Sequence, residues 1–158
     1  MTALVDERRS QVCLGLDPDP AKLLPGIAVE SGGGDDSPAV LAGRAVAAHC
    51  RELIALAGPH CVAVKPQLAC FERLGPPGWE ALAAAREAAA EAGLIFLADG
   101  KRGDVPVTAA AYAQALVGST PTPWGDVAGL GADAFTANPL LGRDALEPLV
   151  AACEEADA

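Results

Sequence analysis

The sequence has few aromatic side chains, but its composition is not that of a disordered chain. Aromatic residues make up 4% of the 158 residues, whereas 51% are hydrophobic and many of those are alanine. This composition is typical of a globular domain rich in small helix-forming residues. A chain of this length can bury a sizeable core. We therefore expect residues 1–158 to form a single domain without an internal linker.

Paired cysteines are also missing. The five cysteines contain no CxxC pair and are odd in number: Cys13, Cys50, Cys61, Cys70 and Cys153. Most lie in apolar runs, where free cysteine behaves as a small buried hydrophobe, so we expect neither a disulfide framework nor a zinc site. The N-terminal MTALVDERRSQ lacks the apolar core of a signal peptide, and no run reaches membrane-spanning length. These absences predict a reduced, soluble protein of the cytoplasm.

Positive charge is scarce. Eleven Lys and Arg oppose 21 Asp and Glu, which gives a formal net charge of −10 at pH 7. Such a surface repels nucleic-acid phosphates and anionic lipids, so we expect neither nucleic acid nor a membrane as a partner. A small anionic ligand remains compatible with the sequence, because a local basic cluster overrides the overall field.

What the sequence does contain is an alternation of strand-like and helical segments. Ser37 and Pro38 precede one helical pattern as N-cap and first-turn proline, and Gly93 is placed to end another. Four β–α units in succession favour a parallel sheet with right-handed crossovers. The expected strands are 11–17, 61–65, 93–99 and 132–138, and the expected helices are 39–57, 78–92, 107–117 and 143–158.

Two α/β architectures fit this alternation: a doubly wound open sheet and a (β/α)8 barrel. No GxGxxG follows the first strand and no P-loop occurs, so the common nucleotide-binding fingerprints are absent. The one glycine cluster, SGGGDDSP at 31–38, follows no strand directly, and its composition predicts a flexible loop.

Charged residues gather where the expected strands end. Asp17, Lys65, Asp99 and Lys101 each stand at the C-terminal end of a strand, the edge at which parallel α/β folds build their active sites. Because side chains alternate along a strand, Asp99 and Lys101 project to the same side. Asp104 follows just beyond the strand. The alternative is a surface ion pair at a turn.

The segment ADGKRGDVPVTAAAYA contains the pattern D-x-K-x-x-D and resembles the signature of orotidine 5′-phosphate decarboxylase, in the bacterial branch with the KRGD form. Three further segments match that family in the same order: GLDPDP, VKPQLACFERLG and GADAFTANPLLGRDALEPL. The resemblance covers almost the whole chain. It implies a (β/α)8 TIM barrel, of which this chain would hold the first four β–α units, the N-terminal half.

The resemblance also implies roles for individual residues. Asp17 would bind a ribose hydroxyl, and the array of the family would be Lys65, Asp99, Lys101 and Asp104. Asp104 and Thr108 would act in trans across a homodimer. Asn138, at the end of the fourth strand, is a further candidate for substrate binding. The implied reaction converts orotidine 5′-phosphate to UMP in de novo pyrimidine biosynthesis, with no metal and no organic cofactor.

Two other functions remain open. A related phosphosugar barrel, such as a keto-gulonate-phosphate decarboxylase or hexulose-phosphate synthase, would carry an acidic metal ligand where this chain has Lys65. A non-catalytic half-barrel is the second, because the phosphate-binding loops of such barrels follow strands seven and eight. We therefore expect the chain alone to be weakly active or inactive. Arg102, His49 and His60 are expected to be structural, and Trp79 and Trp124 to pack near loops.

Overall fold

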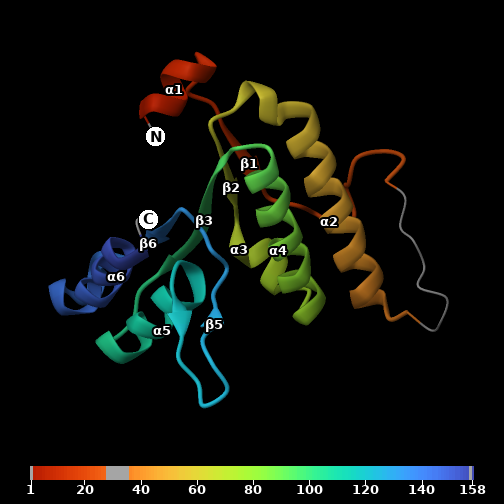
Figure 1. Cartoon of the computed structure of the whole chain (residues 1–158). Coiled ribbons are helices and arrows are strands. Elements are labelled where there is room, and N and C mark those ends of the chain that lie inside the picture. The colour runs from red at the N-terminus through yellow and green to blue at the C-terminus, as the bar shows by residue number, and fades with distance from the viewer. Residues whose placement is uncertain (1, 28–35, 157) are drawn as a thin grey trace. The chain divides into compact units, whose positions relative to one another are not determined.

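A computed structural model describes residues 2–27, 36–156 and 158. Most of the predicted glycine-rich loop, residues 31–35, lies outside the described residues. The chain forms two compact units, Met1–Phe96 and Leu97–Ala158 (Figure 1). No helix in the described part of the chain is long and apolar enough to cross a bilayer.

The first unit is built from strands that alternate with helices. The predicted segments are present, with ends shifted by a few residues. In chain order the unit contains α1 (Thr2–Arg8), β1 (Cys13–Leu16), α2 (Pro38–Ala57), the 3₁₀ turn η1 (Gly58–His60), β2 (Ala63–Pro66), α3 (Leu68–Glu72), α4 (Pro76–Glu91) and the start of β3 (Ile95–Arg102).

Local sequence signals explain where these helices begin and end. The side chain of Ser37 accepts a hydrogen bond from the main-chain N–H of Val40, and Pro38 occupies the first turn of α2, which confirms the predicted cap. Gly93 has φ +62°, and its N–H donates to the carbonyl of Ala90 as α4 ends. Glycine adopts this left-handed backbone without a steric penalty, so the chain can turn directly into β3.

The strands of the first unit are parallel. Cys13 lies opposite Ala63 and Gly15 opposite Lys65 in the β1–β2 ladder, and Val64 lies opposite Phe96. The helices α2 and α4 pack side by side (Figure 1). Alternate strand residues are buried with helix side chains in one apolar core, which includes Leu16, Val46, Ile54, Val64, Phe71, Leu82 and Phe96.

The second unit contains the rest of β3 and a further β–α repeat. Its elements are α5 (Pro106–Leu116), the short strands β4 (Ser119–Thr120) and β5 (Val127–Ala128), β6 (Ala134–Ala137), the 3₁₀ turn η2 (Pro139–Leu141) and α6 (Arg143–Ala156). Ala109, Ala113 and Leu149 join α5 to α6, and Phe135 of β6 packs against them. The carboxyl-terminal part of β3 pairs with β6 in parallel.

The hydrogen-bonded order of the parallel strands is therefore β1-β2-β3-β6, with β3 contributing to both units. This succession of four β–α units confirms the predicted α/β class. No pattern in the sequence predicted α1, α3 or the β4–β5 hairpin. The prediction that Trp124 packs near a loop was wrong, because this residue is 92% exposed at the hairpin tip, where Thr122 and Gly125 make the turn.

Candidate functional site

Two of the predicted site residues, Asp99 and Lys101, are in direct contact. The ammonium Nζ of Lys101 lies 2.6 Å from Oδ1 of Asp99. The Asp99 side chain is only 6% exposed, whereas that of Lys101 is 62% exposed. A buried carboxylate requires a counter-charge and hydrogen bonds. A surface ion pair at a turn would leave both groups in water, so that alternative does not describe this pair.

A third residue, Thr136 of β6, completes this contact. Its hydroxyl Oγ1 accepts a hydrogen bond from the main-chain N–H of Lys101 and donates one to Oδ1 of Asp99, both at 2.8 Å. Thr136 was not among the predicted site residues. The available signal was alternation in AFTA, which places Thr136 on the strand face opposite Phe135, whose ring packs against the α5 and α6 core.

The backbone of β3 is irregular where these residues lie. Ala98 faces Phe135 and Arg102 faces Ala137, so three residues of β3 span a single residue of β6. Within this bulge Lys101 has φ +49°, in the left-handed region. A non-glycine residue there costs about 1–3 kcal/mol and is found where the surrounding structure enforces it, often at functional sites. The contact between Asp99 and Lys101 thus depends on a bulge, not on simple alternation.

Asp17 and Lys65 lie in the first unit, at the carboxyl ends of β1 and β2. Gly15 is the strand partner of Lys65, and Asp17 follows two residues later, so by alternation the two side chains share a sheet face. Burial raises the pKa of the Cys13 thiol, and the positive charge of Lys65 partly opposes that rise. The Lys65 ammonium therefore lies close enough to the Cys13 thiol to act on it, on the same face of the sheet.

Asp104, Thr108 and Asn138 lie in the second unit, Asp104 just after β3, Thr108 in the first turn of α5 and Asn138 just after β6. Asp104 accepts a hydrogen bond from the main-chain N–H of Val105 at 2.7 Å and makes no ion pair with a described residue. The Asn138 side chain accepts from the N–H of Leu140 at 3.1 Å and caps η2. A Cβ at Gly103 would lie 2.6 Å from the carbonyl oxygen of Asn138, so the loops after β3 and β6 touch.

Two of the residues expected to be structural, Arg102 and His49, contact other parts of the chain. The Arg102 guanidinium lies 5.3 Å from the centre of the Tyr112 ring. His49 accepts a hydrogen bond at Nδ1 from the N–H of Leu24. All five cysteines are free thiols. Within residues 2–27, 36–156 and 158, no group of three or more His, Cys, Asp or Glu side chains is placed to hold a metal ion.

Comparison with known proteins agrees with this arrangement. The family model of the orotidine 5′-phosphate decarboxylase / HUMPS family matches residues 10–158. The chain belongs to this family. A curated orotidine 5′-phosphate decarboxylase of Rhodopirellula baltica is 40% identical over 98% of the chain and 49% of its own length. One of Deinococcus radiodurans is 44% identical over 66% of the chain and 35% of its own length.

Solved structures of the family show the same fold. A putative orotidine 5′-phosphate decarboxylase of Streptomyces avermitilis superposes with a TM-score of 0.72 at 30% identity, over 99% of this chain and 48% of its own. UMP synthase of Leishmania donovani superposes with a TM-score of 0.69 at 33% identity, over 96% of this chain and 27% of its own. The fold is therefore that of the family's TIM barrel, and the chain spans about half the length of the curated relatives it matches.

Proposed function

We propose that this chain carries the Lys–Asp–Lys–Asp array of an orotidine 5′-phosphate decarboxylase, which converts orotidine 5′-phosphate to UMP and CO2. The observation that carries the proposal is the contact at 2.6 Å between the buried Asp99 carboxylate and the Lys101 ammonium. The two orotidine 5′-phosphate decarboxylases that are 40% and 44% identical to this chain support the substrate. Lys65 at the end of β2, where the metal-dependent alternatives would carry an acidic ligand, supports the decarboxylase over those alternatives.

The chemistry follows from where the charges lie. Loss of CO2 from C6 of the pyrimidine leaves a carbanion with little internal stabilisation. The Lys101 ammonium, held beside that carbon, would lower the energy of the developing negative charge and then donate the proton that replaces CO2. Asp99 would lie against the departing carboxylate and disfavour the bound substrate relative to the transition state. The reaction so described uses no metal and no organic cofactor.

Lys65 and Asp17 would complete the site from the first unit. Two aspartates close together are driven to share a proton unless cations separate them. Lys65 and Lys101 would provide that separation and keep Asp99 and Asp104 ionised. Asp17, exposed after β1, would accept a hydrogen bond from a ribose hydroxyl. In this proposal the two compact units, which share β3, belong to one barrel domain.

We further propose that the active form is a homodimer in which Asp104 and Thr108 serve the partner's site. Large apolar side chains follow β3 and β6, in the segments that come directly after each strand. They are strongly exposed: Val105 at 57%, Val107 at 83%, Leu140 at 87% and Leu141 at 58%. A monomer rarely leaves such a group in water.

Asn138, in the segment that follows β6, would contact substrate through its amide nitrogen. A cytoplasmic location fits the five free thiols, which stay reduced there.

The activity is tested with a chimera in which this chain replaces the matching half of the Rhodopirellula baltica relative. We expect the chimera to consume orotidine 5′-phosphate in an ultraviolet assay, and Lys101→Ala to lower kcat by at least about 10²–10³-fold, the usual loss for one group aimed at developing charge. Arg51→Ala, on the exposed face of α2, is the matched control. A folded chimera without turnover, or one indifferent to Lys101→Ala, contradicts the proposal. The 158-residue chain alone should turn over far more slowly.

The proposal that Asp104 acts in the partner's site has its own test. Lys101→Ala and Asp104→Ala chimeras should each be inactive, and a mixture of the two should regain activity. In a mixed dimer, one site combines an intact Lys101 with an intact Asp104 from the other subunit. A mixture that forms mixed dimers by sedimentation or native mass spectrometry but stays inactive shows that Asp104 acts within its own subunit.

A further inference from the structure

The hydroxyl of Thr136 links the main chain of Lys101 to the carboxylate of Asp99. Lys101 N–H donates to Oγ1, and Oγ1–H donates to Oδ1 of Asp99, each at 2.8 Å. The same Oδ1 receives the Lys101 ammonium at 2.6 Å. Three hydrogen bonds thus connect the backbone of Lys101, through Thr136 and Asp99, to the Lys101 side chain. The covalent structure of Lys101 closes the ring.

The ring includes the irregular part of the β3 backbone. Three residues of β3 bulge opposite Thr136, and Lys101 is left-handed at φ +49°. A hydrogen bond to the N–H of Lys101 opposes relaxation of that residue to ordinary strand geometry. Because Thr136 has a single hydroxyl proton, its donation to Asp99 leaves the lone pairs for the Lys101 N–H, so both bonds have a unique direction.

We propose that Thr136 is a positioning residue, which sets the left-handed turn at Lys101 and the rotation of the Asp99 carboxylate before substrate binds. This inference rests on the proposed function and deepens it. Thr136 itself donates no group to the reaction. Its hydroxyl holds the ammonium and the carboxylate in their reactive positions, so that neither must reorganise as charge develops.

The hydroxyl also favours the ionised form of Asp99, since a hydrogen bond donated to a carboxylate stabilises its charge. Removal of the hydroxyl therefore has three expected effects. The Lys101 amide exchanges its proton with solvent faster, the Asp99 carboxyl titrates at a higher pH, and kcat falls more than KM changes.

Thr136→Val and Thr136→Ser separate these effects from packing, because valine keeps the shape and serine keeps the hydroxyl. In the 158-residue chain we expect Thr136→Val to speed exchange of the Lys101 amide at least tenfold and to raise the Asp99 pKa by about one unit, a typical effect of one charged hydrogen bond. Thr136→Ser should restore both values. Thr120→Val, at an exposed threonine of β4, is the matched control.

The kinetic measurement uses the chimera described above, in which Thr136→Val should lower kcat about 10–100-fold and Thr136→Ser should recover most of it. If the wild-type chimera is inactive, the proposed function fails while the exchange and titration data still decide the role of Thr136. An unprotected Lys101 amide in the wild-type chain overturns the inference without any variant. So does a Thr136→Val chain whose Lys101 exchange and Asp99 titration match those of the wild type.

Discussion

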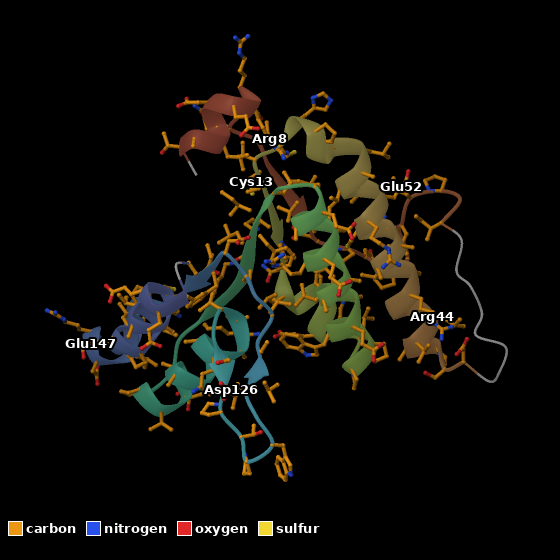
Figure 2. The ribbon with its side chains drawn as sticks, in the orientation of Figure 1. Arg8, Cys13, Arg44, Glu52, Asp126 and Glu147 are labelled. Carbon is orange, nitrogen blue, oxygen red and sulfur yellow. The ribbon has the colours of Figure 1, made fainter. Side chains whose placement is uncertain are left out.

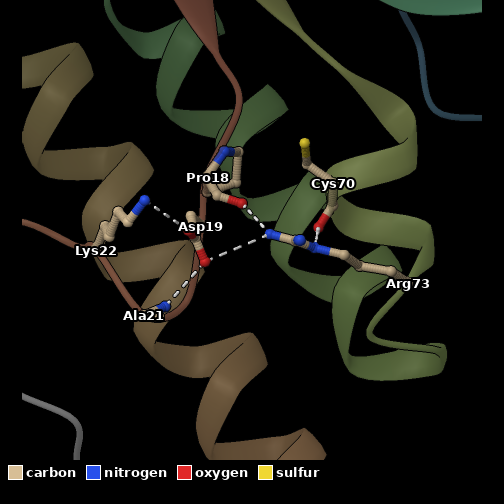
Figure 3. A network of polar contacts seen from close by, with 6 residues as sticks. All are labelled: Pro18, Asp19, Ala21, Lys22, Cys70 and Arg73. Atoms are coloured by element: carbon tan, nitrogen blue, oxygen red, sulfur yellow. Dashed lines mark hydrogen bonds and ion pairs between the residues drawn. The ribbon is translucent and has the colours of Figure 1, made fainter.

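Arg73, at the end of α3, donates from Nη2 to the main-chain carbonyl oxygen of Pro18 at 2.7 Å (Figure 3). Its Nε–H donates to the carbonyl of Cys70, at 3.3 Å. One side chain therefore ties the helix after β2 to the residue that follows Asp17. The Asp19 carboxylate lies 4.0 Å from the same guanidinium and accepts a hydrogen bond from Ala21 N–H.

Arg73→Ala should loosen the segment that carries Asp17. We expect the amides of Ala21 and Lys22, which donate to the side chain and main chain of Asp19, to exchange at least several-fold faster by NMR. In the chimera, KM should rise more than kcat falls, because a ribose contact acts equally on substrate and transition state. Arg44→Ala, which removes a half-exposed arginine paired with Asp36 at 2.6 Å, is the matched control. Unchanged exchange at both amides would refute this role.

Arg8 should contribute strongly to the stability of the first unit. Arg8 is the last residue of α1 (Figure 2). Its guanidinium donates to four carbonyl oxygens, those of Gly58, Cys61, Ala92 and Gly93, at 2.6–3.1 Å. Arg8→Ala leaves these carbonyls without that donor, and we expect a loss of about 2–4 kcal/mol in urea unfolding, given about 1.5–3 for one charged hydrogen bond in favourable cases.

Two variants check the origin of that loss. Arg8→Lys keeps the charge but lacks the planar fork, so it should recover less than half of the stability. Arg51→Ala removes an exposed arginine from α2 and should change stability by no more than about 0.5 kcal/mol. A destabilisation by Arg8→Ala as small as that of the control would show that the four hydrogen bonds contribute little.

Gly43 allows α2 and α4 to pack closely. A Cβ at this position would lie 2.7 Å from both Cβ and the carbonyl oxygen of Pro77. Helix propensity alone predicts that Gly43→Ala stabilises the chain by about 1 kcal/mol. Because the backbone of α4 must move to admit the methyl group, we expect instead a destabilisation of about 1–3 kcal/mol in thermal or urea unfolding. Gly15→Ala, with nothing within 4 Å, should not destabilise. An increase in stability for Gly43→Ala would contradict the packing.

The sequence alone predicted the parallel β–α order because hydrophobic runs, Ser37, Pro38 and Gly93 are local signals that the tertiary structure obeys. It also predicted that the side chains of Asp99 and Lys101 project to the same side, and in the structure the two are in contact. It did not predict why they meet, since the bulge in β3 is set by pairing with β6, a strand over thirty residues later. Thr136 was missed for the same reason: its hydroxyl has a role only once that pairing places it opposite the bulge.

The short elements were missed on other grounds. Helix α1 buries no residue and is held by Arg8, an interaction with no periodic signature. Helix α3 has only five residues, too few for a periodicity to register. The hairpin β4–β5 depends on the turn from Thr122 to Gly125, where Gly125 has φ +116°, within a stretch that composition alone describes as a loop.

His49 should make the first unit less stable in mild acid. Burial lowers the pKa of this imidazole, and Nδ1 must be unprotonated to accept the hydrogen bond from Leu24 N–H. The unfolded chain, with a histidine pKa of about 6.5, then binds the proton more readily than the folded chain, so stability is retained above that pH and falls as the pH drops below it. His49→Asn places an oxygen acceptor near the position of Nδ1 without a titrating group, and should therefore lose less stability between pH 7.5 and pH 5 in urea unfolding.

His60→Asn removes an exposed imidazole of the same unit and is the matched control. If His49→Asn and wild type lose equal stability over that range, His49 does not cause the acid sensitivity.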